Sequence, residues 1–155
     1  MNRAASHTYQ TQSLMTASPA RLVAMLYDRA IGSLREAVRA INAGDIEARC
    51  RANQRAIEII GHLAGAVDEA RGGEIAANLS RLYRFMLLRL PRVDIKNDAR
   101  TAEEVIEILE PLRQSWHELA DRGAAALRQD SGGAAAQPRA EPSEIEAVAR
   151  LQVSA

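Results

Sequence analysis

Apolar residues recur every three or four positions along four stretches of the chain, which is the pattern of amphipathic helices. Before the first stretch, Ser18 is a preferred N-cap and Pro19 suits the first helical position, while Gly44 is a typical C-terminal cap. The apolar face of this stretch consists of Leu22, Val23, Leu26, Tyr27, Ala30, Leu34, Ala37, Val38 and Ile41. The pattern therefore predicts a long first helix between Pro19 and Gly44.

The second helix is expected to begin after Asp45, a suitable cap, and to end at the pair Gly72–Gly73. Its core seam, with spacings of four and three, is predicted to be Ile46, Cys50, Asn53, Ile57, Ile60, Ala64 and Val67. This seam leaves Ile59 and Leu63 off the core side, on a strip that small side chains extend at Ala52 and Ala56.

The third helix is expected to begin near Glu74 and to end or bend at Pro91. Its core face is Ile75, Leu79, Leu82, Tyr83, Met86 and Leu90. The capping-box pattern Thr101–Glu104 opens the fourth helix, in which Pro111 predicts a bend or a lost hydrogen bond. The core face of this helix is Val105, Leu109, Leu112, Trp116 and Leu119.

Short connections between helices of similar length favour antiparallel neighbours, so we expect an all-α, antiparallel four-helix bundle over residues 18–128. A flexible N-terminal segment, 1–17, precedes it, and a low-complexity tail, 129–155, follows it. Within the tail, Ser143–Glu146 is a second capping-box pattern, and Ile145, Val148, Ala149 and Val153 have the spacing of one short amphipathic helix. The composition of the tail favours frayed chain over that helix.

Composition narrows the possible functions. Lys+Arg and Asp+Glu both number 20, and this zero balance argues against a nucleic-acid-binding protein. Hydrophobic residues make up 47% of the chain but aromatic residues only 3%, which favours packed helices over a β-sandwich. Cys50 is the only cysteine, so no internal disulfide forms. No apolar run is long enough to span a membrane and no secretory signal is visible, so we expect a cytoplasmic protein without membrane insertion.

Catalytic and metal-binding patterns are weak. Glu58 and His62 have no matching second pair, as a di-metal bundle requires, and no phosphate-binding Gly-rich loop with Lys is present. We therefore expect no metal, no cofactor and no enzyme activity. His62 is the one residue that suits a phosphotransfer bundle, although it lacks a nearby Lys and is interpreted as a surface residue. A helical signalling module acting through His62 stays as the alternative function.

Apolar residues on the outward side of two helices are more informative. Ile59 and Leu63 form one such pair, and Phe85 and Leu88 form another among the arginines of the third helix. Scattered exposed apolar residues are normal. The other interpretation is a groove that the N-terminal segment, the tail or a partner helix covers. The N-terminal segment has three suitable apolar residues for such a cover: Tyr9, Leu14 and Met15.

Four stretches of the sequence, in order, resemble one known family. They are 9–19 with 22–28 (YQTQSLMTASP and LVAMLYD), 72–83 (GGEIAANLSRLY), 95–98 (IKND) and 104–116. Together they cover about residues 8–120 and are similar to the flagellin-specific export chaperones, the FliS family. Arg29 departs from the family pattern, which has Gly at that position, and Pro91 is unusual for the family.

The resemblance implies a cytoplasmic helical bundle without catalytic activity. It would bind the C-terminal segment of flagellin, prevent premature polymerisation, and keep flagellin competent for the flagellar type III export apparatus. The resemblance assigns Tyr9 to flagellin binding. From this we derive a hypothesis in which Tyr9, Leu14 and Met15 form a removable lid. The client would then contact the two outward pairs, Ile59 with Leu63 and Phe85 with Leu88.

Overall fold

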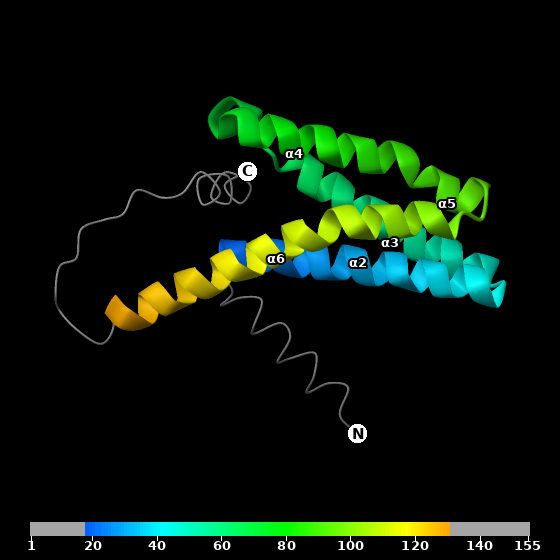
Figure 1. Cartoon of the computed structure of the whole chain (residues 1–155), viewed down its shortest axis with the longest axis horizontal. Helices are drawn as coiled ribbons and strands as arrows, with labels where there is room; N and C mark the ends of the chain where they lie inside the picture. Colours follow the sequence, from blue (N-terminus) through cyan, green and yellow to red (C-terminus); the bar gives the residue numbers. More distant parts are fainter. Residues whose placement is uncertain (1–17, 131–155) are drawn as a thin grey trace, which may run out of the picture.

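The computed structural model describes residues 18–130 of the chain. It consists of α2 (Pro19–Ala43), α3 (Ile46–Gly65), α4 (Glu69–Arg89), the short α5 (Pro91–Ile95) and α6 (Ala99–Asp130), with no strand in these residues. The four long helices run antiparallel to their neighbours in the chain (Figure 1). This confirms the predicted all-α four-helix bundle, and it adds α5, which the sequence pattern did not predict.

Both ends of α2 lie where the sequence predicts them. The Ser18 side chain accepts a hydrogen bond from the backbone N–H of Arg21 at 3.2 Å, and Pro19 is the first helical residue. Gly44 closes the helix at φ 72°, a left-handed conformation that glycine adopts without a steric penalty. Its N–H is directed at the carbonyls of Ala40 and Ile41, so these carbonyls at the end of the helix have a hydrogen-bond donor.

The predicted boundary at Gly72–Gly73 is wrong. The second long helix, α3, ends at Gly65, and α4 already begins at Glu69. Asp68 starts α4 by accepting a hydrogen bond from the backbone N–H of Arg71 at 3.1 Å. Gly73, at φ 58° and ψ −140°, then kinks α4 instead of ending it. The Asp68 cap therefore starts the helix one turn before the glycine pair, although two glycines in sequence favour a helix end.

The start of α6 also differs from the prediction. Asp98 caps the helix, because its carboxylate accepts from the N–H of Thr101 at 3.2 Å and from the Thr101 hydroxyl at 2.8 Å. The helix thus begins at Ala99 and not at Thr101. Pro91 begins α5 after α4 has ended at Arg89. The other proline, Pro111, is exposed and α6 continues through it.

Helix α2 is the centre of the bundle, since it packs along both α3 and α6, while α4 packs mainly against α3 (Figure 1). Most of the predicted core residues of α2 and α6 are buried, although Leu26 is 38% exposed. Of the face predicted for α4, Tyr83 and Met86 are buried, whereas Ile75, Leu79 and Leu82 are only partly buried. The buried aromatic residues Tyr27 and Tyr83 join α2 to α4 through a hydrogen bond between their hydroxyl groups. These contacts fix α4 with one side on α3 and the other side outward.

The predicted seam of α3 is only partly right. Asn53 and Ile60 are buried as predicted, but Ile46 is 66% exposed and Cys50 is also exposed. The remaining buried positions of α3 are Arg49, Ala52, Ala56 and Leu63. Because α3 lies between α2 and α4, its small alanines face inward, where they permit close helix packing. The buried face of α3 is therefore rotated about the helix axis relative to the predicted seam, so that it includes the alanines and leaves Ile46 and Cys50 exposed.

Candidate protein-binding surface

The outward pair on α4 is confirmed as an exposed apolar pair. Phe85 is 46% and Leu88 is 75% exposed, although both are large hydrophobic side chains. Met86, between them in the sequence, is fully buried, so the two sides of α4 differ as the helical period requires. The guanidinium of Arg89 lies 5.3 Å from the centre of the Phe85 ring, a cation–π distance.

The outward pair predicted on α3 is wrong for one residue. Leu63 is only 2% exposed and belongs to the core. Ile59 is half-buried and packs against the core. Ala52 and Ala56, predicted to extend the same strip, are fully buried. The error follows from the misplaced seam, because a helix that turns its alanines inward also turns Leu63 inward.

A groove of about 330 Å³ lies between α3 and α4, beside the exposed pair. Its lining consists of Ala64, Glu69, Ser80, Arg84, Leu87 and Leu88. Leu88 thus belongs both to the exposed pair and to the groove. Sequence reasoning missed Ala64, which the seam placed in the core, and Leu87. The prediction placed Leu63 on the outer side of α3 and Ala64 in the core seam. With Leu63 in the core instead, the neighbouring Ala64 comes to lie beside α4.

Arginines adjoin this surface. Arg81 and Arg84 are exposed, and no acidic residue within 18–130 forms an ion pair with either of them. With Phe85 and Leu88 they occupy positions i, i+3, i+4 and i+7, which lie on one side of a helix. We call these four residues the outer face of α4. It combines two apolar side chains with two positive charges that have no partner in the described residues.

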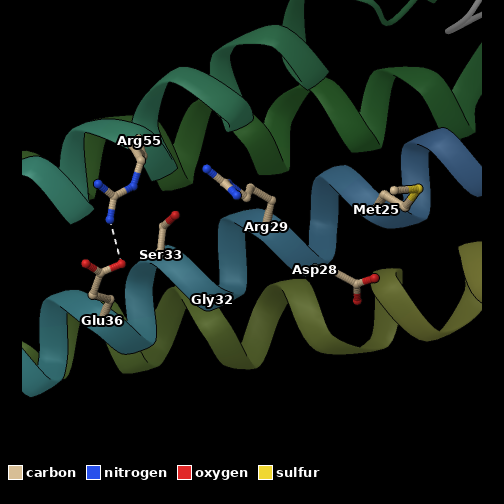
Figure 2. A pocket seen from close by; sticks show the side chains of 7 residues that line it. All are labelled: Met25, Asp28, Arg29, Gly32, Ser33, Glu36 and Arg55. Carbon is tan, nitrogen blue, oxygen red and sulfur yellow. Dashed lines mark hydrogen bonds and ion pairs between the residues drawn. The ribbon is translucent and has the colours of Figure 1, made fainter. Parts of the chain in front are cut away.

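A second groove, of about 500 Å³, lies along α2 and α3 (Figure 2). It is lined by Met25, Asp28, Arg29, Gly32, Ser33, Glu36 and Arg55. Arg55 pairs with Glu36 at 2.5 Å across the two helices. Arg29 is exposed here, so the residue that departs from the family pattern lies in a surface groove and not in the core.

Asp28, at the edge of this second groove, is turned toward α6 (Figure 2). Its carboxylate contacts Nε2 of His117 at 3.0 Å and accepts from Arg113 at 3.3 Å. Arg21 donates to Nδ1 of the same imidazole at 3.2 Å. Because arginine has no acceptor, Nδ1 must accept and Nε2 must carry the proton that it donates to Asp28. His117 thus joins α2 to α6 as a structural residue.

His62 is exposed near the end of α3, which confirms the surface interpretation. No three His, Cys, Asp or Glu side chains in residues 18–130 are grouped to hold a metal ion. No helix in this part of the chain has the length and apolar character to cross a membrane. Tyr9, Leu14 and Met15 lie outside the described residues.

Comparison with known proteins identifies the family. Residues 1–123 match the family model described as flagellar protein FliS. The chain belongs to the FliS family. A flagellar secretion chaperone FliS of Salmonella typhimurium is 38% identical over 111 residues, which cover 71% of this chain and 82% of that protein. Another, from Bacillus subtilis, is 32% identical over 127 residues, or 82% of this chain and 93% of that protein.

The FliS match confirms the resemblance inferred from the four sequence stretches. FliS proteins are chaperones and not enzymes, in agreement with the sequence prediction. The match includes the N-terminal segment with Tyr9 and continues through Gly123 in α6. It does not include residues 124–155, so the tail is an addition to the part that this chain shares with the FliS family model.

Proposed function

We propose that this FliS family member is a cytoplasmic export chaperone that binds the C-terminal segment of flagellin. Binding prevents premature polymerisation and keeps flagellin competent for the flagellar type III export apparatus. The observation that carries the proposal is the exposed pair Phe85 and Leu88 beside the groove between α3 and α4. A bundle helix that packs on one side only has no structural need for these two side chains on its other side.

The surface suits an amphipathic segment that orders when it binds. Such a segment loses conformational entropy on binding, and apolar burial must offset that loss. Burying Phe85 and Leu88 stabilises the complex by roughly 1.5–3 kcal/mol for each side chain. Leu87 and Ala64 give the neighbouring groove an apolar floor, and Arg84 stands at its edge for an acidic group of the client. Ile59 adds a half-buried side chain on α3.

The N-terminal segment supplies the removable lid in this proposal. Tyr9, Leu14 and Met15 cover apolar surface of the bundle in the free protein and leave it when flagellin binds. These three residues are close in sequence to the bundle, because Ser18, three residues after Met15, is the N-cap of α2. Release of the client needs no nucleotide or covalent step in this mechanism, since it occurs by competition or by pulling at the export gate.

The test is the double substitution Phe85→Ser with Leu88→Ser in the full chain. We expect the Kd for a flagellin C-terminal peptide, measured by calorimetry, to rise about 30- to 1,000-fold. This corresponds to a loss of about 2–4 kcal/mol from two hot-spot residues. Both side chains are exposed, so circular dichroism should show unchanged helicity.

Ile46→Ser is the matched control, because Ile46 is 66% exposed but lies at the start of α3, outside the groove. It should bind flagellin as the unmodified chain does. An unchanged Kd in the double variant, with intact helicity, would remove the α4 pair from the site. Absence of flagellin binding by the unmodified chain would remove the proposed function itself.

A further inference from the structure

The outer face of α4 has the composition of a docking surface for one particular kind of segment. Arg81 and Arg84 bring two positive charges that no acidic residue of 18–130 pairs with, and Phe85 and Leu88 bring two exposed apolar side chains. An occupant that complements this order has two acidic residues followed by two apolar residues, at the same helical spacing. The chain itself contains such a segment outside the described residues.

The tail repeats the spacing of the outer face with opposite charge. Glu141, Glu144, Ile145 and Val148 stand at positions i, i+3, i+4 and i+7, as do Arg81, Arg84, Phe85 and Leu88. Aligned in parallel with an offset of 60 residues, each glutamate meets an arginine and each apolar residue meets an apolar residue. Parallel helices that pair in register choose partners through such flanking charges. Pro142 suits the first position of a helix, so a helix that begins there places Glu141 at its start and contains Glu144, Ile145 and Val148.

The length of chain between the bundle and this segment allows the contact. Glu104 of α6 pairs with Arg89 of α4, so these two residues are level along the bundle axis. Asp130 is 26 residues beyond Glu104 (130 − 104), and Arg84 is 5 residues from Arg89 (89 − 84), in the same direction along the axis. At 1.5 Å per residue, about 31 Å separates Asp130 from Arg84 along the axis. The 13 residues 131–143 span up to about 45 Å when extended.

We propose that the tail segment 141–153 binds the outer face of α4 as a short helix parallel to α4. Glu141 and Glu144 pair with Arg81 and Arg84, while Ile145 and Val148 cover Phe85 and Leu88. Alone in water so short a helix is marginal, and its formation depends on this contact. The segment lies beyond the FliS match, which ends at residue 123.

Docking of the tail makes the chaperone self-limiting. This regulation rests on the proposed function, because it requires flagellin to use the same face. A binding surface that is uncovered for a tenth of the time shows about a tenfold weaker apparent affinity. The tail would then exclude weak apolar ligands while flagellin, which contacts more of the bundle, displaces it.

The direct test needs no flagellin. In the full chain, Ile145→Ser with Val148→Ser should shift the backbone amide NMR signals of residues 81–88 and leave those of α2 unchanged. Glu144→Arg should shift the same signals. The matched control Asp130→Arg makes the same charge change at the end of α6, before the docking segment, and should not shift them. Unchanged signals at Phe85 and Leu88 in the double variant would overturn the proposal.

Two further arms distinguish other occupants. The difference between the full chain and the double variant should persist after tenfold dilution, because the contact lies within one chain; a difference that vanishes on dilution identifies a second copy and overturns the proposal. In the chain that combines Glu141→Arg and Glu144→Arg with Arg81→Glu and Arg84→Glu, adding Ile145→Ser and Val148→Ser should again shift the signals of Phe85 and Leu88. In the chain with Arg81→Glu and Arg84→Glu alone, the same addition should change these signals much less. A charge-exchanged chain that does not respond to the addition argues against the parallel alignment.

The flagellin arm separates this inference from the proposed function. Ile145→Ser with Val148→Ser should tighten binding of a flagellin C-terminal peptide about three- to tenfold, as the covered fraction falls. Equal affinity for both chains leaves the proposed function standing and contradicts regulation by the tail. NMR shifts at α4 without any flagellin binding would instead support tail docking and contradict the proposed function.

Discussion

At the residue scale, a buried hydrogen bond links two helices beside the core of a third. The Tyr27 hydroxyl in α2 is hydrogen-bonded to the Tyr83 hydroxyl in α4, and the indole of Trp116 in α6 is buried in the same core. Burial, helped by Tyr83, raises the pKa of Tyr27, so its hydroxyl keeps its proton at any physiological pH.

Tyr83→Phe should therefore lower the free energy of unfolding by about 1–3 kcal/mol, because the Tyr27 hydroxyl then loses a buried partner. Urea denaturation followed by circular dichroism measures this loss. Tyr27→Phe combined with Tyr83→Phe should cost less than the sum of the two single changes, since the double variant leaves neither hydroxyl buried alone. Additive losses would mean that the two hydroxyl groups stabilise the bundle independently.

The residue scale is also where sequence reasoning was least complete. The outward position of Phe85 and Leu88 was predictable. The large residues Tyr83 and Met86 mark one side of α4 as the core side, and the helical period then places Phe85 and Leu88 on the opposite side. On α3 the choice lay between alanines and larger residues. Alanine is equally compatible with core and surface, so only the close packing of α3 between its neighbours turns Leu63 inward.

At the element scale, the cap of α6 has a defined pH dependence. Asp98 accepts two hydrogen bonds from Thr101 and pairs with Arg92 at 3.5 Å, and these contacts hold the pKa of its carboxyl below the ordinary value. A carboxyl whose pKa is lower in the folded state stabilises the fold above its unfolded pKa, and that contribution disappears as the pH falls through the folded pKa.

Asp98→Ala should therefore lower the melting temperature at pH 7 and have a smaller effect at an acid pH below the folded-state pKa of Asp98, where the carboxyl is protonated in both states. Asp98→Asn is the matched variant, because its side chain still accepts the Thr101 N–H but cannot ionise. It should fall between the original chain and the alanine variant at pH 7. A loss on Asp98→Ala that is equal at both pH values would contradict the charge-dependent cap.

Element ends were predictable where one local signal dominates and unpredictable where two compete. Ser18, Pro19 and Gly44 act alone, and α2 begins and ends as they indicate. At the start of α4, the Asp68 cap competes with Gly73, and the structure accommodates both as a short first turn followed by a kink. Helix α5 has only five residues, too few for any apolar period to reveal it.

At the scale of the whole molecule, the bundle has a strongly buried half and a weakly buried half. In α2, nine residues are buried, including Tyr27 and Leu34, whereas α4 buries only Ala76, Tyr83 and Met86 between Glu69 and Arg89. The antiparallel four-helix order was predictable from loop lengths, but this inequality was not, since periodicity gives every amphipathic helix a similar apolar side. It arises because α2 packs between two long helices, while α4 leaves one side exposed.

Native-state hydrogen exchange should therefore divide the molecule. We expect the amides of α2 to exchange slowest, near the rate set by global unfolding, and those of α4 to exchange faster through local opening, because local stability follows burial. Mass spectrometry of peptides from each helix measures both rates. Adding the flagellin C-terminal peptide should slow exchange in α4 more than in α2, because the proposed client covers the side of α4 that the bundle leaves open. Equal rates in the two helices before addition would show that α4 unfolds only with the whole bundle.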